Sequence, residues 1–142
     1  YQGGAPLLPP EWEAAHDVRL WDRFFDNYVQ GPMNAIVVDR ITGSKGDMAR
    51  ERAALGKAYR MIDERVASRQ WIAGDNFSIA DCAAAPALFY AATLVPFADG
   101  ASHLAAYFER LMARPSVHRV LEEAKPYFSM YPFEEAIPAR FR

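Results

Sequence analysis

The stretch from Phe77 to Asp81, with the apolar run behind it, constrains the fold of this chain more than any other feature. Ser78 precedes Asp81 by three residues, the spacing of a helix-capping box in which each side chain can bond the other's backbone N–H. The run from Cys82 to Tyr90 is almost wholly apolar, and a helix without a polar face is a buried helix. The sequence therefore predicts a central, capped helix from Ser78 to about Leu94, with Cys82 buried and inert in it.

Apolar residues also recur at helical spacing outside this run. They predict helices over residues 10–30, 47–69, 102–114 and 116–124. Gly31-Pro32 is expected to kink the first helix or to start a new piece, since proline has no backbone N–H. Ser102 is expected to cap the helix that begins there, and the tail from Pro126 to Arg142 to be non-helical but packed. No stretch alternates as a strand does, so the predicted class is all-α.

Composition excludes several kinds of protein. The 142 residues predict one domain, and a net charge of −2 with both signs mixed gives no electrostatic footprint for nucleic acid. No apolar run approaches the ~20 residues that span a membrane. The single cysteine excludes an internal disulfide and suits a reducing, cytoplasmic compartment. The histidines show no metal-ligand spacing, so no metal site is expected.

Three segments resemble one known family. Trp71 to Asp81 resembles the pattern that opens the core helix in the C-terminal domain of glutathione transferases. Leu104 to Val117 resembles the helix–Arg-Pro–helix ending of that domain, and Gly3 to Pro9 resembles its inter-domain linker. The resemblance implies a bundle of about five helices around a buried core helix, of the bacterial cytosolic type. It implies a linker over residues 1–10 and the helical domain over residues 11–142.

The same resemblance implies what the domain does. In the family, the thiolate of glutathione is conjugated to an apolar electrophile. Glutathione is thus a substrate, no metal is used, and the protein is a homodimer. The thiol-activating group and most glutathione-binding residues belong to an N-terminal thioredoxin-like domain that is absent from this sequence. No catalytic residue is therefore expected here, and the fragment alone is expected to be inactive. The alternative is a non-catalytic interaction module, because translation and scaffold proteins use the same fold.

The resemblance also implies site residues, anchored on Trp21 and Asp81. Gln30, Met33 and Tyr90 are expected to line the electrophile pocket. Some relatives keep histidine at the position of Gln30, so this glutamine argues against direct polarisation of the thiol from the first helix. Plain core packing is an equally good interpretation of Met33 and Tyr90, because apolar helix faces are usually packed.

Two charged residues after Trp21 are expected to reach glutathione bound by the partner subunit. Asp22 and Arg23 could pair with the ammonium and carboxylates of that tripeptide. The alternative is an exposed, salt-bridged helix face of small energetic value. For Asp81, the spacing to Ser78 favours capping over a role as a catalytic acid.

Overall fold

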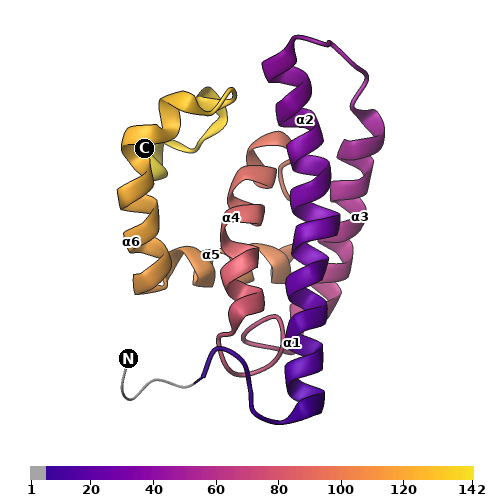
Figure 1. The fold of residues 1–142 in the computed structure, drawn as a ribbon, viewed down its shortest axis with the longest axis vertical. Coiled ribbons are helices and arrows are strands. Elements are labelled where there is room, and N and C mark those ends of the chain that lie inside the picture. Colours follow the sequence, from indigo (N-terminus) through magenta and orange to yellow (C-terminus); the bar gives the residue numbers. More distant parts are fainter. Residues whose placement is uncertain (1–5) are drawn as a thin grey trace.

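The computed structural model describes residues 6–142, which fold into helices joined by short connections (Figure 1). Residues 1–5 of the expected linker lie outside this range, and residues 6–10 form no helix. The described α-helices are α1 Trp12–Phe24, α2 Gly31–Thr42, α3 Ala49–Val66, α4 Ile79–Leu94, α5 Ser102–Ala113 and α6 Pro115–Ala124. Within residues 6–142 there is no strand, and an isolated bridge joins Trp71 and Gly74. The all-α prediction is confirmed.

α1 and α2 belong to one continuous helix. They are joined by a π-helical turn, η1 (Phe25–Gln30), whose end is marked by a bond from the N–H of Gly31 to the carbonyl of Asp26. Pro32 lies in the first turn of α2 and has no N–H to give to the helix ladder. A single π-helical turn is one way in which a helix stays continuous next to a missing hydrogen bond. α2 thus begins at Gly31 as one alternative predicted, but without a break in the helical backbone.

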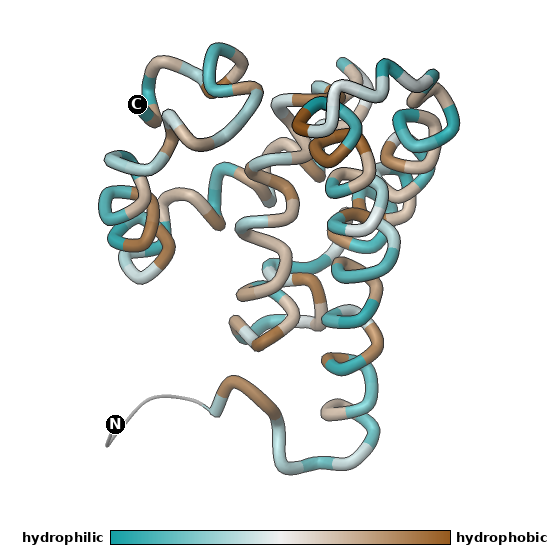
Figure 2. Tube along the Cα trace, turned by 45° about the horizontal axis from the view of Figure 1, so that its top comes forward, coloured by the Kyte–Doolittle hydropathy of each residue, from teal (hydrophilic) through white to brown (hydrophobic). Residues whose placement is uncertain are grey.

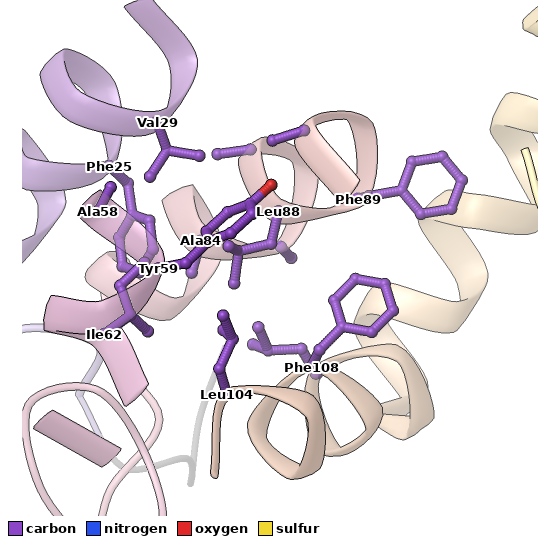
Figure 3. Packing of buried hydrophobic residues seen from close by; sticks show 14 of the residues in the cluster. Phe25, Val29, Ala58, Tyr59, Ile62, Ala84, Leu88, Phe89, Leu104 and Phe108 are labelled. Carbon is purple, nitrogen blue, oxygen red and sulfur yellow. The ribbon is translucent and has the colours of Figure 1, made fainter. Parts of the chain in front are cut away.

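α4 is the central helix. It packs against α1, η1, α2 and α5, and Figure 1 shows it lying between α6 and the α1–α3 group. Its tube is drawn mainly in brown tints in Figure 2, while the outer helices alternate between teal and brown. Figure 3 shows side chains from η1 and α3 meeting α4 around Phe25, Val29, Tyr59, Ile62 and Leu88. Small residues on α4, such as Ala80, Ala84 and Ala91 at 0% exposure, let its neighbours approach closely.

The start of α5 is capped by a residue from another helix. The helix begins at Ser102, but its N-cap position is Ala101 and has no side-chain cap. The N–H of Leu104 instead donates to Oδ1 of Asp63 on α3 at 2.7 Å. This carboxylate satisfies one of the free N–H groups that every helix start leaves. The expected Ser102 cap is therefore wrong, because a tertiary contact supplies the acceptor.

The C-terminal segment is packed, and its backbone forms short 3₁₀ helices: η2 Lys125–Met130, η3 Glu134–Ala136 and η4 Ala139–Phe141. Phe128 and Ile137 are buried. The ring of Phe141 lies 5.4 Å from that of Phe89 on α4 and 6.3 Å from that of Phe108 on α5. Figure 3 shows Phe89 directed toward this segment. The expected packing is confirmed, but the expected absence of helix is wrong because 3₁₀ turns form.

Candidate functional site

The carboxylate of Asp81 organises the first turn of α4. It is fully buried, and the capping box that the spacing predicts is present. Its oxygens accept hydrogen bonds from the N–H of Ser78 at 2.9 Å, the hydroxyl of Ser78 at 2.9 Å, the N–H of Ile72 at 3.0 Å and the phenol of Tyr107 at 2.7 Å. Four donors fill the acceptor capacity of a carboxylate. This arrangement is structural and leaves Asp81 no free oxygen for acid–base chemistry.

An open apolar cavity of about 350 Å³ lies between α4 and α6. Among the residues that the structure describes, Arg119 is the only charged one in its lining; the others are Ser116, Cys82, Tyr90 and apolar residues. Such a volume and such walls are typical of small-molecule sites. We call this feature the α4–α6 cavity; its lining includes Phe77, Cys82, Pro86, Tyr90, Val117 and Val120.

The apolar face of α6 forms one wall of the cavity. Val117, Val120, Leu121 and Ala124 recur at helical spacing and all line the cavity. None of the residues of α6 is buried, although the helix is amphipathic. The helix packs against the end of α5 and against η2. The apolar face of α6 is therefore presented across the cavity to α4 and is only partly covered: Val117, Leu121 and Ala124 are half-buried, and Val120 is exposed.

Cys82 is an exposed residue and lines the α4–α6 cavity, so the expectation that it is buried is wrong. The apolar run of α4 predicted burial on all sides, but this side of the helix faces the cavity. Partial burial, with the neighbouring Asp81 carboxylate, raises the pKa of the Cys82 thiol. Because the thiolate is the reactive form, this shift disfavours a nucleophilic role.

The three residues expected to line the electrophile pocket lie in different surroundings. Tyr90 lines the α4–α6 cavity, and burial raises the pKa of its phenol. Met33 is 4% exposed and belongs to the core. Gln30 is half-buried on η1, and its amide donates to Oδ1 of Asn34 at 3.1 Å. Neither Gln30 nor Met33 lines the cavity that contains Tyr90, so this domain does not bring the three together in one pocket.

Tyr90 has neighbours that the sequence did not indicate. Its ring lies 4.8 Å from that of Tyr131 in the C-terminal segment. The hydroxyls of Tyr131 and Thr93 lie 2.8 Å apart, and the Thr93 hydroxyl donates to the carbonyl of Tyr90 at 2.7 Å. These contacts hold the C-terminal segment beside the Tyr90 end of the cavity. Tyr131 and Thr93 are 38 residues apart, and no local pattern signals their pairing.

Asp22 and Arg23 form surface ion pairs. The guanidinium of Arg23 lies 3.1 Å from the carboxylate of Asp26 and 4.0 Å from that of Asp22. The Arg23 side chain is 71% exposed and that of Asp22 is 24% exposed. In this domain Arg23 therefore fits the interpretation as an exposed, salt-bridged residue, whereas Asp22 is half-buried. Their contact with glutathione across a dimer stays a prediction.

The described residues contain neither a metal-binding group of side chains nor a membrane-spanning helix. No three His, Cys, Asp or Glu side chains within residues 6–142 lie close enough together to hold a metal ion. No helix in the same range is both long and apolar enough to cross a membrane.

Comparison with known proteins gives a consistent family. The family described as "Glutathione S-transferase, C-terminal domain" matches residues 24–115. Over 70 residues the chain is 33% identical to Glutathione S-transferase GstA of Escherichia coli O157:H7; this covers 49% of the chain and 35% of that protein. The chain thus matches about a third of the length of this curated relative.

Solved structures agree on the fold. A glutathione S-transferase domain-containing protein of Marinobacter aquaeolei superposes with a TM-score of 0.71 at 18% identity, covering 81% of this chain and 61% of that one. A glutathione S-transferase of Methylobacterium radiotolerans, solved in complex with glutathione sulfonate, has a TM-score of 0.60 at 28% identity. That match covers 80% of this chain and 57% of the other.

Proposed function

Since the chain belongs to the glutathione S-transferase C-terminal domain family, we propose that it is the electrophile-binding helical domain of a glutathione transferase. The catalytic protein would join it to an N-terminal thioredoxin-like domain, as the resemblance of its sequence implies. The α4–α6 cavity carries this proposal, because an open apolar site of about 350 Å³ beside Tyr90 suits a small aromatic molecule.

The proposed reaction is nucleophilic substitution by glutathione. The thiolate sulfur attacks an electrophilic carbon, a C–S bond forms, and a leaving group such as chloride departs with the electron pair of its bond. The thiol proton passes to a base or to solvent. The preceding domain would lower the pKa of the glutathione thiol, since the thiolate is the nucleophile.

The residues of this chain would hold the electrophile. Tyr90 offers a large apolar face with one polar tip, and Tyr131 supports its ring from the C-terminal segment. Gln30 is proposed as a polar contact from η1 that meets the substrate only when the preceding domain completes the site. We assign Met33 to the core instead, since it is 4% exposed.

A homodimer is proposed from the exposed apolar side chains on the α1–α3 side. The large apolar residues that are more than half exposed on these elements are Trp12, Leu20, Tyr28, Val38, Ile41 and Met61. Large apolar side chains left exposed in this number are a reason to propose a protein interface on these elements. Asp22 and Arg23 would then lie on a surface from which they could reach glutathione of the partner. The cytoplasm is the proposed location, given the single, unpaired cysteine.

Conjugation of glutathione to chlorodinitrobenzene tests the proposed function. The chain alone is expected to show no turnover above the uncatalysed rate. The longer protein, expressed with the coding sequence upstream of Tyr1, is expected to be active. Turnover by residues 1–142 alone would show that the catalytic residues are misplaced. No turnover by the longer protein would favour the alternative, an interaction module with the same fold.

A further inference from the structure

We propose that a second cavity, at the turn between α2 and α3, binds a free α-amino acid with an apolar side chain. The cavity has a volume of about 320 Å³, near the lower end of the ~300–1,000 Å³ that is typical of ligand pockets. No described residue lines both this cavity and the α4–α6 cavity, so the inference goes beyond the proposed function. We call this feature the α2–α3 cavity; its lining includes Asp39, Arg40, Asp47, Arg52 and Phe133.

The turn between the two helices fixes both carboxylates of the cavity. Oδ1 of Asp39, in the last turn of α2, accepts a hydrogen bond of 2.8 Å from the N–H of Gly46. A Cβ at Gly46 would lie 2.7 Å from the terminal methyl of Met48 and 3.0 Å from Oδ1 of Asp39, so the turn packs tightly onto both. Oδ1 of Asp47 accepts a hydrogen bond of 2.9 Å from the N–H of Ala49 at the start of α3. Each carboxylate is thus held through one oxygen, and its second oxygen can accept from a ligand.

The two guanidinium groups are held at other points of the wall. Nη1 of Arg52 on α3 donates to the carbonyl of Leu94, at the end of α4, at 2.6 Å. The guanidinium of Arg40 lies 5.4 Å from the centre of the Phe133 ring, in the C-terminal segment that reaches toward the end of α2 in Figure 1. A guanidinium has five N–H donors, so both arginines keep donors with which to bind a carboxylate.

The four charged groups do not neutralise one another. None of them forms an ion pair with another residue in the part of the chain that the structure describes, although all four line one cavity. The cavity therefore presents two positive and two negative groups at separate, fixed points. A ligand with one charge would be repelled by two of these groups, whereas a ligand that carries an ammonium and a carboxylate can pair with both kinds.

The rest of the lining suits an apolar side chain on this ligand. Ile36 is buried, and Met48 and Phe133 are half-buried with part of their surface toward the cavity. Covering this carbon surface is favourable, and the ring of Phe133 favours an aromatic partner. The charges and the apolar wall together indicate an amino acid such as phenylalanine, which combines both kinds of group in one small molecule.

Calorimetric titration of the longer protein with L-phenylalanine tests the inference. We expect saturable binding at one site per chain. The affinity should be at least about tenfold higher than for 3-phenylpropanoate, which lacks the ammonium, and for 2-phenylethylamine, which lacks the carboxylate, because each leaves charged groups without a partner. Binding that does not saturate by about 10 mM, or equal binding of either analogue, would overturn the inference.

Three charge variants of the longer protein localise the site. Arg40→Gln removes a guanidinium, and Asp39→Asn removes a charge while it keeps an oxygen for the N–H of Gly46. Each is expected to lower the affinity for L-phenylalanine at least about tenfold. Arg60→Gln is the matched control, because Arg60 is exposed on α3 and does not line the cavity, and its affinity is expected to stay unchanged. Equal losses in Arg40→Gln and Arg60→Gln would overturn the site.

Conjugation activity, measured on the same preparations, separates this inference from the proposed function. A longer protein that conjugates glutathione but does not bind L-phenylalanine overturns the inference and leaves the function standing. A protein that binds L-phenylalanine through Arg40 and Asp39 but does not conjugate supports the site and overturns the function. If glutathione displaces L-phenylalanine from the cavity with higher affinity, the cavity takes the tripeptide and the proposed class of ligand is overturned.

Discussion

The phenol of Tyr107 on α5 donates a hydrogen bond of 2.7 Å to Oδ1 of Asp81 on α4, and both residues are fully buried. Asp81 also bonds the N–H of Ile72, in the loop before α4, at 3.0 Å. One carboxylate thereby connects the start of the central helix with a loop and with a second helix. A buried charge is tolerated only when donors replace its water. The four donors to Asp81 are therefore expected to be worth more to stability than an ordinary surface cap.

Replacing Tyr107 by phenylalanine removes one of these donors and keeps the ring. We expect Tyr107→Phe to lower the free energy of unfolding by about 1–3 kcal/mol, because a buried charged acceptor loses a partner. Urea unfolding measures the change. Tyr28→Phe is the matched control, since Tyr28 is 60% exposed, and its midpoint is expected to stay within error of the parent. Equal effects of the two substitutions would contradict the importance of the bond to Asp81.

The same tyrosine makes stability depend on alkaline pH. Burial, followed by the charge of Asp81, raises the pKa of Tyr107 well above its usual value of 10.0, and burial also raises the pKa of Tyr59. Below pH 10 the phenols are protonated in both folded and unfolded chains. Above it the unfolded chain loses protons that the folded chain keeps, so stability falls by about 1.4 kcal/mol per pH unit for each such group.

Unfolding midpoints measured from pH 8 to pH 11 check this behaviour, over about three pH units around the usual tyrosine pKa. The fall in stability should begin near pH 10 and should be shallower in Tyr107→Phe, which lacks one of the raised groups. An identical slope in the parent and in Tyr107→Phe would show that Tyr107 ionises normally in the folded protein.

The sequence predicted features whose cause is local. The capping box joins Ser78 and Asp81, which are three positions apart, and the helices follow from apolar periodicity. Tyr107 lies 26 residues from Asp81, so this partner could not be found from spacing. The uniform apolar run of α4 marked no exposed side, which is why Cys82 was expected to be buried. Met33 lies one turn after Gln30, and the sequence predicted that both would line one pocket. The structure instead buries Met33 in the core and leaves Gln30 half-buried.

Two variants test which residue caps α5: Ser102, as the sequence predicted, or Asp63, as the structure shows. Asp63→Ala removes the acceptor for the N–H of Leu104 and is expected to cost about 1 kcal/mol, the usual value of a helix cap. Ser102→Ala is expected to have little effect, because Ser102 makes no capping bond. Thermal or urea unfolding of the two variants measures this difference. A larger loss for Ser102→Ala would return the cap to the residue that the sequence suggested.

Tyr90 and Met33 are expected to respond differently to truncation in the longer, catalytic protein. Tyr90 lines the open cavity, so Tyr90→Ala should raise KM for chlorodinitrobenzene by about two- to twelvefold, from the loss of ~0.5–1.5 kcal/mol of aromatic contact. KM for glutathione should stay nearly unchanged, since only binding of the electrophile is weakened. Met33 is 4% exposed, so Met33→Ala should instead destabilise the fold by about 2–5 kcal/mol through a core cavity. Steady-state kinetics together with unfolding curves separate the two effects. If Met33→Ala raised only the electrophile KM, or Tyr90→Ala only lowered stability, the assignment of Tyr90 to the site and Met33 to the core would be reversed.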